Sequence, residues 1–343
     1  MEAYVRGDNS PLRIMVQRYE ICVCWPNFWG GSVLKLLICG DNLLICAVKW
    51  IFFANFAVAK LYAAQKALLT TKTNSMNEIK KALFISQEIT PYLAANAHSR
   101  FGRALPEAII AKGIEVRTFM PRYGCINERR NQLHEVIRLS GLNIVIDDTN
   151  HPLLIKVATL QPSRMQVYFI DNDDYFEGHG AEELETVTNA EENDERSIFY
   201  VRGVIETARK LRWAPEVVHC TGWISAVAPL YLKHMYGEDP TFVNTKVVFS
   251  LFDCPFEGEL DKRMAEKLQQ DGFSAEDVKS VADGVTYESL CRLAMDHADA
   301  IVISSGNVPA SLVEYARSAG KPLLEVPECD NLGDVYMDFY KSL

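Results

Sequence analysis

Residues 81–123 read KALFISQEITPYLAANAHSRFGRALPEAIIAKGIEVRTFMPRY. The stretch holds two short apolar runs bounded by polar residues, 81–86 and 115–120, which are typical of strands buried on both faces of a parallel sheet. Between them, residues 106–112 followed by Gly113 predict a helix with a glycine at its C-terminal end. A strand, a crossover helix and a second strand in one stretch indicate the opening unit of a doubly wound sheet.

The chain continues to alternate between these two kinds of element. Further strands are expected at 153–159, 165–170, 217–219, 247–251, 300–304 and 323–326. Further helices are expected at 198–211, 224–235, 286–298 and 309–319, with an amphipathic last helix at 334–343. This alternation predicts an α/β fold with a doubly wound, mostly parallel, Rossmann-like sheet covered on both faces. The stretches 174–194 and 257–284 are expected to be surface insertions.

Composition indicates a globular protein with no nucleic-acid partner. The 343 residues are 48% hydrophobic, enough to bury one large core or two small ones. The net charge of -10 and the lack of a basic stripe argue against nucleic-acid binding. The cysteines after residue 75 are widely spaced and contain no Cys-x-x-Cys pair, which indicates reduced thiols of a cytoplasmic protein. No metal site and no cofactor are predicted.

The first 75 residues differ from the rest. They contain eight basic and four acidic residues, which gives a net charge of +4. Residues 76–343 must therefore carry a net charge of -14 to give the total of -10. Residues 43–59 are apolar apart from Lys49 and Asn55, and a membrane anchor is one interpretation. A cleaved signal peptide fits poorly, because a long segment precedes the apolar run. We expect instead that residues 1–75 are a disordered or wrongly assigned leader, and that Met76 opens the folded domain, 76–343.

Three motifs in order resemble one family, the N-terminal catalytic domain of bacterial glycogen synthases and plant starch synthases. The first is carried by Glu88, Pro91, Leu105, Pro106, Gly113, Val116, Pro121 and Tyr123. The second is WAPEVVHCTGW at 213–223, and the third runs from 246 to Gly258. The resemblance covers residues 80–343. It implies one half of a two-domain GT-B glycosyltransferase that transfers glucose from ADP-glucose to an α-1,4-glucan.

The loop that grips the donor diphosphate in this family is altered. Where the family has a lysine, two glycines and an aspartate, this chain has Ala94, Asn96, Ala97 and Arg100. Glycines let backbone N–H groups approach a pyrophosphate, and a lysine adds a positive charge, so donor binding by this route is expected to be weak. The resemblance places the stretch from Asn96 to Gly102 beside the acceptor. His98 and Arg100 could contact an anion, but solvated loop residues are the simpler interpretation.

The second and third motifs keep their framework and lose polar groups. The family histidine that contacts the transferred sugar is Thr221 here, and an aspartate is replaced by Gly222. His219 is retained, either as a buried hydrogen-bonded imidazole, which we favour, or as a ligand contact. In the third motif Phe252 replaces a histidine and Asp253 replaces an asparagine.

Glu192 and Arg196 open the helix that precedes the second motif. By resemblance Glu192 would bind a sugar hydroxyl and Arg196 would orient it through a salt bridge. The other interpretation is ordinary helix N-terminal chemistry, since acidic residues in a first turn favour the helix dipole. Glu192, His219 and Thr221 are thus the candidate catalytic residues, and Arg196 and Asp253 join the candidate sugar-binding residues.

The family's second domain, which holds most of the donor nucleotide, has no counterpart in residues 76–343. Two functions follow as expectations. One is a glucosyltransferase that uses ADP-glucose and an α-glucan and depends on a partner chain for the second domain. The other is a non-catalytic subunit that binds glucan or a true synthase and regulates it. In both cases we expect the isolated chain to be inactive.

Overall fold

The computed structural model describes residues 79–176, 192–256, 258–326 and 331–343, together with the backbone of four short strands near the N-terminus. The chain divides into two compact units, Met1–Asn77 and Glu78–Leu343. In the first unit β1 (Glu2–Tyr4) pairs antiparallel with β4 (Lys35–Leu37), and β2 (Leu12–Val16) pairs antiparallel with β3 (Tyr19–Val23). Residues 43–59, for which a membrane anchor was one interpretation, lie outside the described residues.

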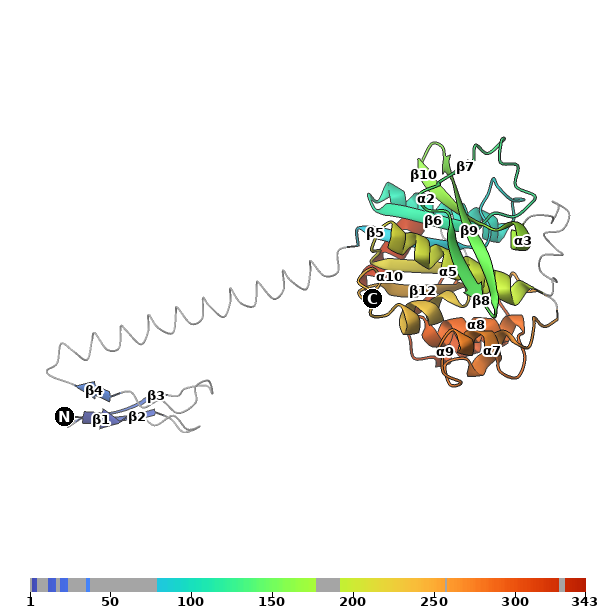
Figure 1. Cartoon of the computed structure of the whole chain (residues 1–343). Coiled ribbons are helices and arrows are strands. Elements are labelled where there is room, and N and C mark those ends of the chain that lie inside the picture. Colours follow the sequence, from blue (N-terminus) through green and yellow to red (C-terminus); the bar gives the residue numbers. More distant parts are fainter. Residues whose placement is uncertain are drawn as a thin grey trace. The chain divides into compact units, whose positions relative to one another are not determined.

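The second unit is built on a ten-stranded sheet (Figure 1). Its strands are β5 (Lys81–Ser86), β6 (Glu115–Pro121), β7 (His134–Glu135), β8 (Leu142–Ile146), β9 (Thr149–Leu160), β10 (Met165–Asp171), β11 (Val217–Thr221), β12 (Lys246–Leu251), β13 (Ala300–Ile303) and β14 (Leu323–Glu325). The order is β14-β13-β12-β11-β5-β6-β10-β9-β7, with β8 also on β9. Neighbours from β14 to β10 are parallel, whereas β9 is antiparallel to β10, β7 and β8. The predicted α/β fold with a mostly parallel sheet is confirmed.

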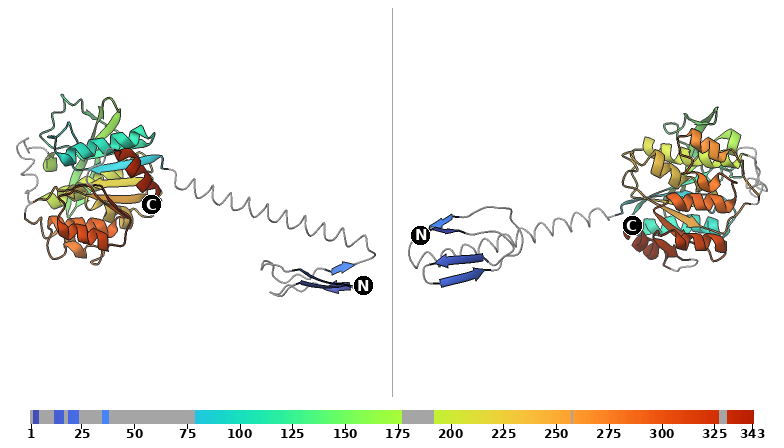
Figure 2. Two further views of the ribbon diagram at one scale, coloured as in Figure 1. Left: turned by 180° about the vertical axis from the view of Figure 1, so that it is seen from behind. Right: turned by 90° about the horizontal axis from the view of Figure 1, so that it is seen from below.

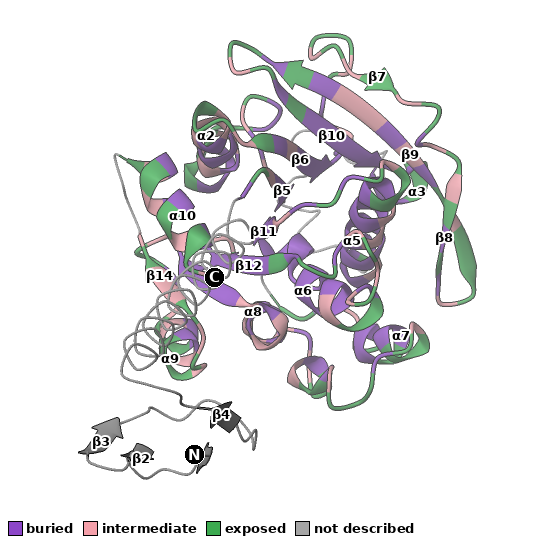
Figure 3. Ribbon diagram, turned by 90° about the vertical axis from the view of Figure 1, so that its left-hand side faces the viewer, coloured by how far each residue is buried: buried purple, intermediate pink, exposed green. Residues whose placement is uncertain are grey.

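Helices cover both faces of this sheet, as two further views show (Figure 2). They are α2 (Ala97–Ala111), α3 (Asp173–Phe176), α5 (Asn193–Lys210), α6 (Ala228–Leu230), α7 (Met264–Gln270), α8 (Tyr287–His297), α9 (Ala310–Ser318) and α10 (Leu332–Lys341). The single helix predicted over 224–235 is instead three short pieces: η2 (Trp223–Ser225), α6 and the π-helix η3 (Tyr231–Met235). α2 and α10 lie on one face, and α5 and α6 on the other (Figure 3).

The side chains of β5 alternate between two hydrophobic cores, one on each face of the sheet. Phe84 packs in the core that also contains Leu105 of α2 and Tyr336 of α10. Leu83 and Ile85 belong to the larger core on the opposite face. All three strand residues are at most 1% exposed, as the period of two in a strand covered on both sides requires.

Helix α2 begins nine residues before the predicted start at Pro106. Asn96 caps it: its side chain accepts the Ser99 backbone N–H at 2.7 Å, and the Ser99 hydroxyl accepts the Asn96 N–H at 2.9 Å. This reciprocal capping box fixes the helix start, and Pro106 is accommodated inside the helix. The stretch from Ala97 to Gly102 is therefore helical, and the expectation of a loop there is wrong.

Residues 258–284 are more than the surface insertion predicted for 257–284. The segment contains α7 and the 3-10 helix η4 (Lys279–Val281), and Lys267 of α7 is 5% exposed. The Lys267 ammonium lies 2.6 Å from Asp194, 2.7 Å from Glu195 and 3.2 Å from Asp261. A buried cation shared by three carboxylates joins α7 to the first turn of α5.

Two further findings concern the described residues as a whole. None of their helices has the length and apolar character that crossing a bilayer requires. Cys125, Cys220, Cys254 and Cys291 are free thiols, as the sequence indicated.

Candidate ligand site at the switch point of the sheet

The chain reverses its direction of sheet growth between β5 and β11. From β5 it moves outward to β6 and β10, then returns to β11 on the other side of β5 and continues to β12, β13 and β14. Thr221 pairs with Ser86, and the Gln87 N–H donates to the Thr221 carbonyl at 3.2 Å. Open α/β sheets hold their ligands at the carboxyl ends of the strands at such a switch point. We call this place, where Gln87, Gly222, His98 and Phe252 pack together, the switch crevice.

Two buried tyrosines fix the chain where it leaves β5. The Tyr200 hydroxyl donates to the Ser86 carbonyl at 2.9 Å, and the Tyr123 hydroxyl donates to the Gln87 carbonyl at 3.2 Å. Because the two carbonyls are held from different elements, the backbone that forms the floor of the switch crevice is rigidly placed.

Gly222 lets α2 approach the end of β11. It has φ +86° and ψ 157°, a backbone conformation that residues with a side chain rarely adopt. A Cβ there would lie 2.5 Å from Gln87 Cβ and Oε1 and 2.8 Å from His98 Cε1. Any side chain at this position would therefore collide with both neighbours.

His98 fills the switch crevice. The side chain is 4% exposed, and its ring stacks on Phe252 with centroids 4.8 Å apart and 30° between planes. Neither ring nitrogen has a hydrogen-bond partner within the described part of the chain. Burial lowers the pKa of His98, and the Glu88 carboxylate only partly opposes this, so the imidazole is neutral. The expectation that His98 is a solvated loop residue is wrong, because α2 turns it inward.

Other buried polar atoms nearby lack partners too. Gln87 Oε1, Thr221 Oγ1 and Trp223 Nε1 make no hydrogen bond to any described residue. Buried polar atoms in native proteins are nearly always paired, and leaving one unpaired costs about 1–3 kcal/mol. Their concentration at the ends of β5 and β11 marks this place as a candidate binding site.

The stretch that resembles the family's donor loop forms the start of α2. The Asn96 amide donates to Glu88 Oε2 at 2.7 Å while its oxygen caps the helix. Ala94 and Ala97 are exposed and uncharged, and Arg100 is exposed on α2. At Gly102 a Cβ would lie 2.2 Å from the Glu88 carbonyl oxygen, so the glycine permits direct packing of α2 on that backbone.

His219 faces α10 rather than the switch crevice. Its Nδ1 lies 2.6 Å from the Tyr340 hydroxyl and its Nε2 lies 2.6 Å from the Ser250 hydroxyl. Burial lowers its pKa to about 3. With both nitrogens engaged inside the fold, His219 has the geometry of a buried structural imidazole.

Glu192 and Arg196 sit at the first turn of α5. Glu192 is 59% exposed, and its carboxylate lies 3.3 Å from Arg196 Nη2. Arg196 is buried and also donates to the Tyr175 carbonyl at 2.7 Å and to Asn193 Oδ1 at 3.0 Å. The arginine thus ties the helix start to α3, while the carboxylate of Glu192 remains at the surface. Asp253 is exposed beside Phe252.

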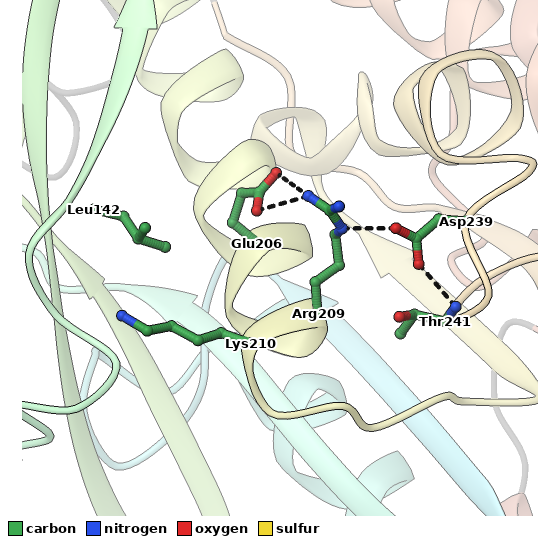
Figure 4. Close-up of a pocket in the computed structure, with 6 residues that line it drawn as sticks. All are labelled: Leu142, Glu206, Arg209, Lys210, Asp239 and Thr241. Carbon is green, nitrogen blue, oxygen red and sulfur yellow. Dashed lines mark hydrogen bonds and ion pairs between the residues drawn. The ribbon is translucent and has the colours of Figure 1, made fainter.

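An open surface pocket of about 380 Å³ lies at the other end of α5 (Figure 4). It is lined by Leu142, Glu206, Arg209, Lys210, Asp239 and Thr241. Arg209 is 2.9 Å from Glu206 and 2.7 Å from Asp239, so these charges are already paired. None of the predicted site residues lines this pocket, which makes it a weaker candidate than the switch crevice.

Sequence reasoning missed the pairing of His98 with Phe252 and the role of Gln87. The spacing Asn96-x-x-Ser99 was the available signal, since a capping box there places His98 in the first turn of a helix.

This fold, with its candidate site at the switch point, defines the class as one Rossmann-like half of a GT-B glycosyltransferase. It resembles the catalytic domain of starch synthase IV from Arabidopsis thaliana bound to ADP and acarbose, with a TM-score of 0.59 and 15% identity over 73% of this chain and 51% of that one. The family described as starch synthase catalytic domain matches residues 81–318, and the chain belongs to this family.

Curated relatives agree with this assignment. The glycogen synthase of Chlorobium chlorochromatii is 33% identical over 249 residues, which is 71% of this chain and 50% of that protein. The glycogen synthase of Chlorobium limicola is 31% identical over 226 residues, 66% of this chain and 45% of that protein. The chain thus spans about half the length of the curated relatives that it matches.

Proposed function

We propose that this chain is an α-glucan-binding member of the synthase family that does not, by itself, transfer glucose from ADP-glucose. The observation that carries the proposal is the electrostatic character of the switch crevice. The charged group that acts on His98 is the Glu88 carboxylate, and the imidazole itself is neutral. A site of this kind repels the diphosphate of a nucleotide sugar and tolerates a neutral sugar.

Diphosphate binding requires free N–H donors and positive charge. In the remodelled loop Ala94 brings no cation, and the side chain of Asn96 is occupied by the helix cap and by Glu88. Ala97 and Asn96 also carry Cβ atoms where the family has glycine. Each change weakens binding of the donor diphosphate. Together the changes argue against glucosyl transfer by this chain alone.

Sugar hydroxyls, in contrast, are neutral donors and acceptors. The unpaired Gln87 Oε1 can accept from a hydroxyl, and the unpaired Thr221 Oγ1 can both donate and accept. Carbohydrate sites combine a few such polar groups with an apolar wall, and Phe252 supplies the wall. The two groups therefore suit a glucan better than a nucleotide.

A second candidate function is glucosyl transfer together with a partner chain. The relatives are about twice as long as the matched region, so a separate chain carrying the second domain could complete the site. Glu192 and Thr221 would then face the acceptor. The remaining candidate is a cytoplasmic regulatory subunit that binds a true synthase and does not itself transfer glucose.

Co-sedimentation of the full chain with glycogen, in parallel with transfer of labelled glucose from ADP-glucose, tests the proposal. We expect the chain to sediment with glycogen and to incorporate no label. Thr221→Val should weaken glycogen binding severalfold, because it removes a hydroxyl that has no partner within the protein's described residues. Thr241→Val, in the surface pocket, is the matched control and should leave binding unchanged. Incorporation of label by the chain alone would refute the proposal.

A further inference from the structure

His98 occupies the switch crevice at an energetic disadvantage. Its ring is 4% exposed, yet both nitrogens lack a partner among the described residues. The favourable contacts are its stacking on Phe252 and its packing against Gly222. A ring that gains van der Waals contact but loses two hydrogen bonds to water is held weakly, so a competing occupant can displace it.

The backbone beside His98 cannot move aside easily. The Asn96 and Ser99 capping box fixes the first turn of α2, and Gly102 packs directly on the Glu88 carbonyl. Displacement of the ring therefore requires rotation of the His98 side chain, with α2 remaining in place.

Removal of the ring would uncover a neutral polar site. Gln87 Oε1 approaches the same side of Gly222 as the His98 ring, and the ring stacks on Phe252, so both would become accessible to an incoming ligand. Thr221 Oγ1, the other unpaired atom, lies at the adjoining end of β11. Glu88 would remain beside the opening, with its carboxylate held by the Asn96 amide. This set of groups fits the hydroxyls and ring of a neutral sugar and disfavours a phosphate.

We propose that His98 is a side-chain gate: it closes the switch crevice in the free protein and must rotate out before the end of an α-glucan enters. This inference rests on the proposed function. It adds the residue that controls entry and the free energy needed to rotate that residue before glucan binds. The measured glucan affinity of the native chain is then reduced by the fraction of molecules in which the gate is open. The residue thus determines both access and affinity.

Calorimetric titration of the full chain with a linear maltooligosaccharide tests the gate. His98→Ala, with His98→Ser as a second opening variant, should bind at least tenfold more tightly than the native chain, because nothing must be displaced. His98→Phe keeps the ring and its stacking on Phe252, so it should show no gain. The same variant should melt at a higher temperature, since it buries no unpaired nitrogens.

Adding Thr221→Val to His98→Ala should cancel the gain if the sugar enters the crevice. Equal affinities of the native chain and His98→Ala, or a gain in His98→Phe, would overturn the gate. If His98→Ala bound ADP more tightly than the oligosaccharide, the inference that the ligand is a neutral sugar would be wrong. If the native chain binds no glucan while His98→Ala does, the gate stands and the proposed function fails. If the native chain binds and His98→Ala binds no better, the function stands and the gate fails.

Discussion

At the scale of single residues, Gly222 is the position of the site where a residue with a side chain is least tolerated. Its φ of +86° and its ψ of 157° fall in a region that glycine alone adopts without strain. The space its missing side chain leaves is taken by Gln87 and His98. The small residue at the end of β11 and the imidazole of α2 are therefore two parts of one packing arrangement.

Gly222→Ala should destabilise the fold by about 1–3 kcal/mol, through backbone strain and the collision with Gln87. Urea unfolding measures the change. Gly306→Ala is the control: a Cβ there meets nothing within 4 Å, and the effect should stay within about 0.5 kcal/mol. Equal effects of the two substitutions would contradict the packing described for the switch crevice.

His219 predicts a pH dependence of stability. Its pKa is about 3 in the folded protein and 6.5 in its ordinary state. Because the unfolded chain takes up the proton more readily, this contribution is fully present above about pH 6.5 and is lost as the pH falls from 6.5 toward 3. Between pH 7 and pH 5 the native chain should lose about 2 kcal/mol relative to His219→Gln, whose amide does not titrate.

Urea unfolding of both proteins at the two pH values measures this difference. Other titrating groups are shared by the two proteins and cancel. Parallel pH profiles would mean that His219 is accessible to protons in the folded state, contrary to its burial between Tyr340 and Ser250.

At the scale of elements, the sequence predicted the strands of the parallel sheet better than the helix that borders the site. Buried parallel strands are continuous apolar runs, and β5, β6 and β12 were placed to within one residue. Helix α2 was placed too late because Pro106 and Gly113 suggested its two ends, although the capping residues Asn96 and Ser99 decide its start. That error hid the inward direction of His98, since only a helix turns it toward Gly222.

The contact between α5 and α7 escaped sequence reasoning for a different reason. It depends on Lys267 meeting the carboxylates of Asp194 and Glu195, and no local pattern pairs groups that lie so far apart in the chain. Once the fold is known, the ion cluster explains how α7 is held to the first turn of α5.

Lys267→Met should cost about 3–5 kcal/mol of stability, because it leaves the buried carboxylate of Asp194 without its cation. Lys279→Met is the matched control. Lys279 is exposed and pairs with Glu276 at the surface, so its loss should change stability by less than about 0.5 kcal/mol. Thermal or urea unfolding distinguishes them, and a native-like Lys267→Met would show that α7 is held by apolar packing alone.

At the scale of the whole molecule, the chain joins one Rossmann-like half of a synthase-type fold to a switch crevice that departs from the family's motifs. The family match over 81–318 confirms the resemblance read from Glu88, Trp213 and the other motif residues. The packing at the switch crevice could not be predicted from those motifs, because it depends on the helix cap at Asn96, which turns His98 onto Phe252. A fold is preserved by core packing, whereas the chemistry of a site depends on a few side chains.

The most direct test of the central claim is calorimetric titration of the full chain with ADP-glucose and, separately, with a linear maltooligosaccharide. The account predicts binding of the oligosaccharide and no measurable heat from ADP-glucose, since the switch crevice holds the Glu88 carboxylate beside a neutral imidazole instead of a cation that would attract a diphosphate. Tight binding of ADP-glucose, with none of the oligosaccharide, would contradict it.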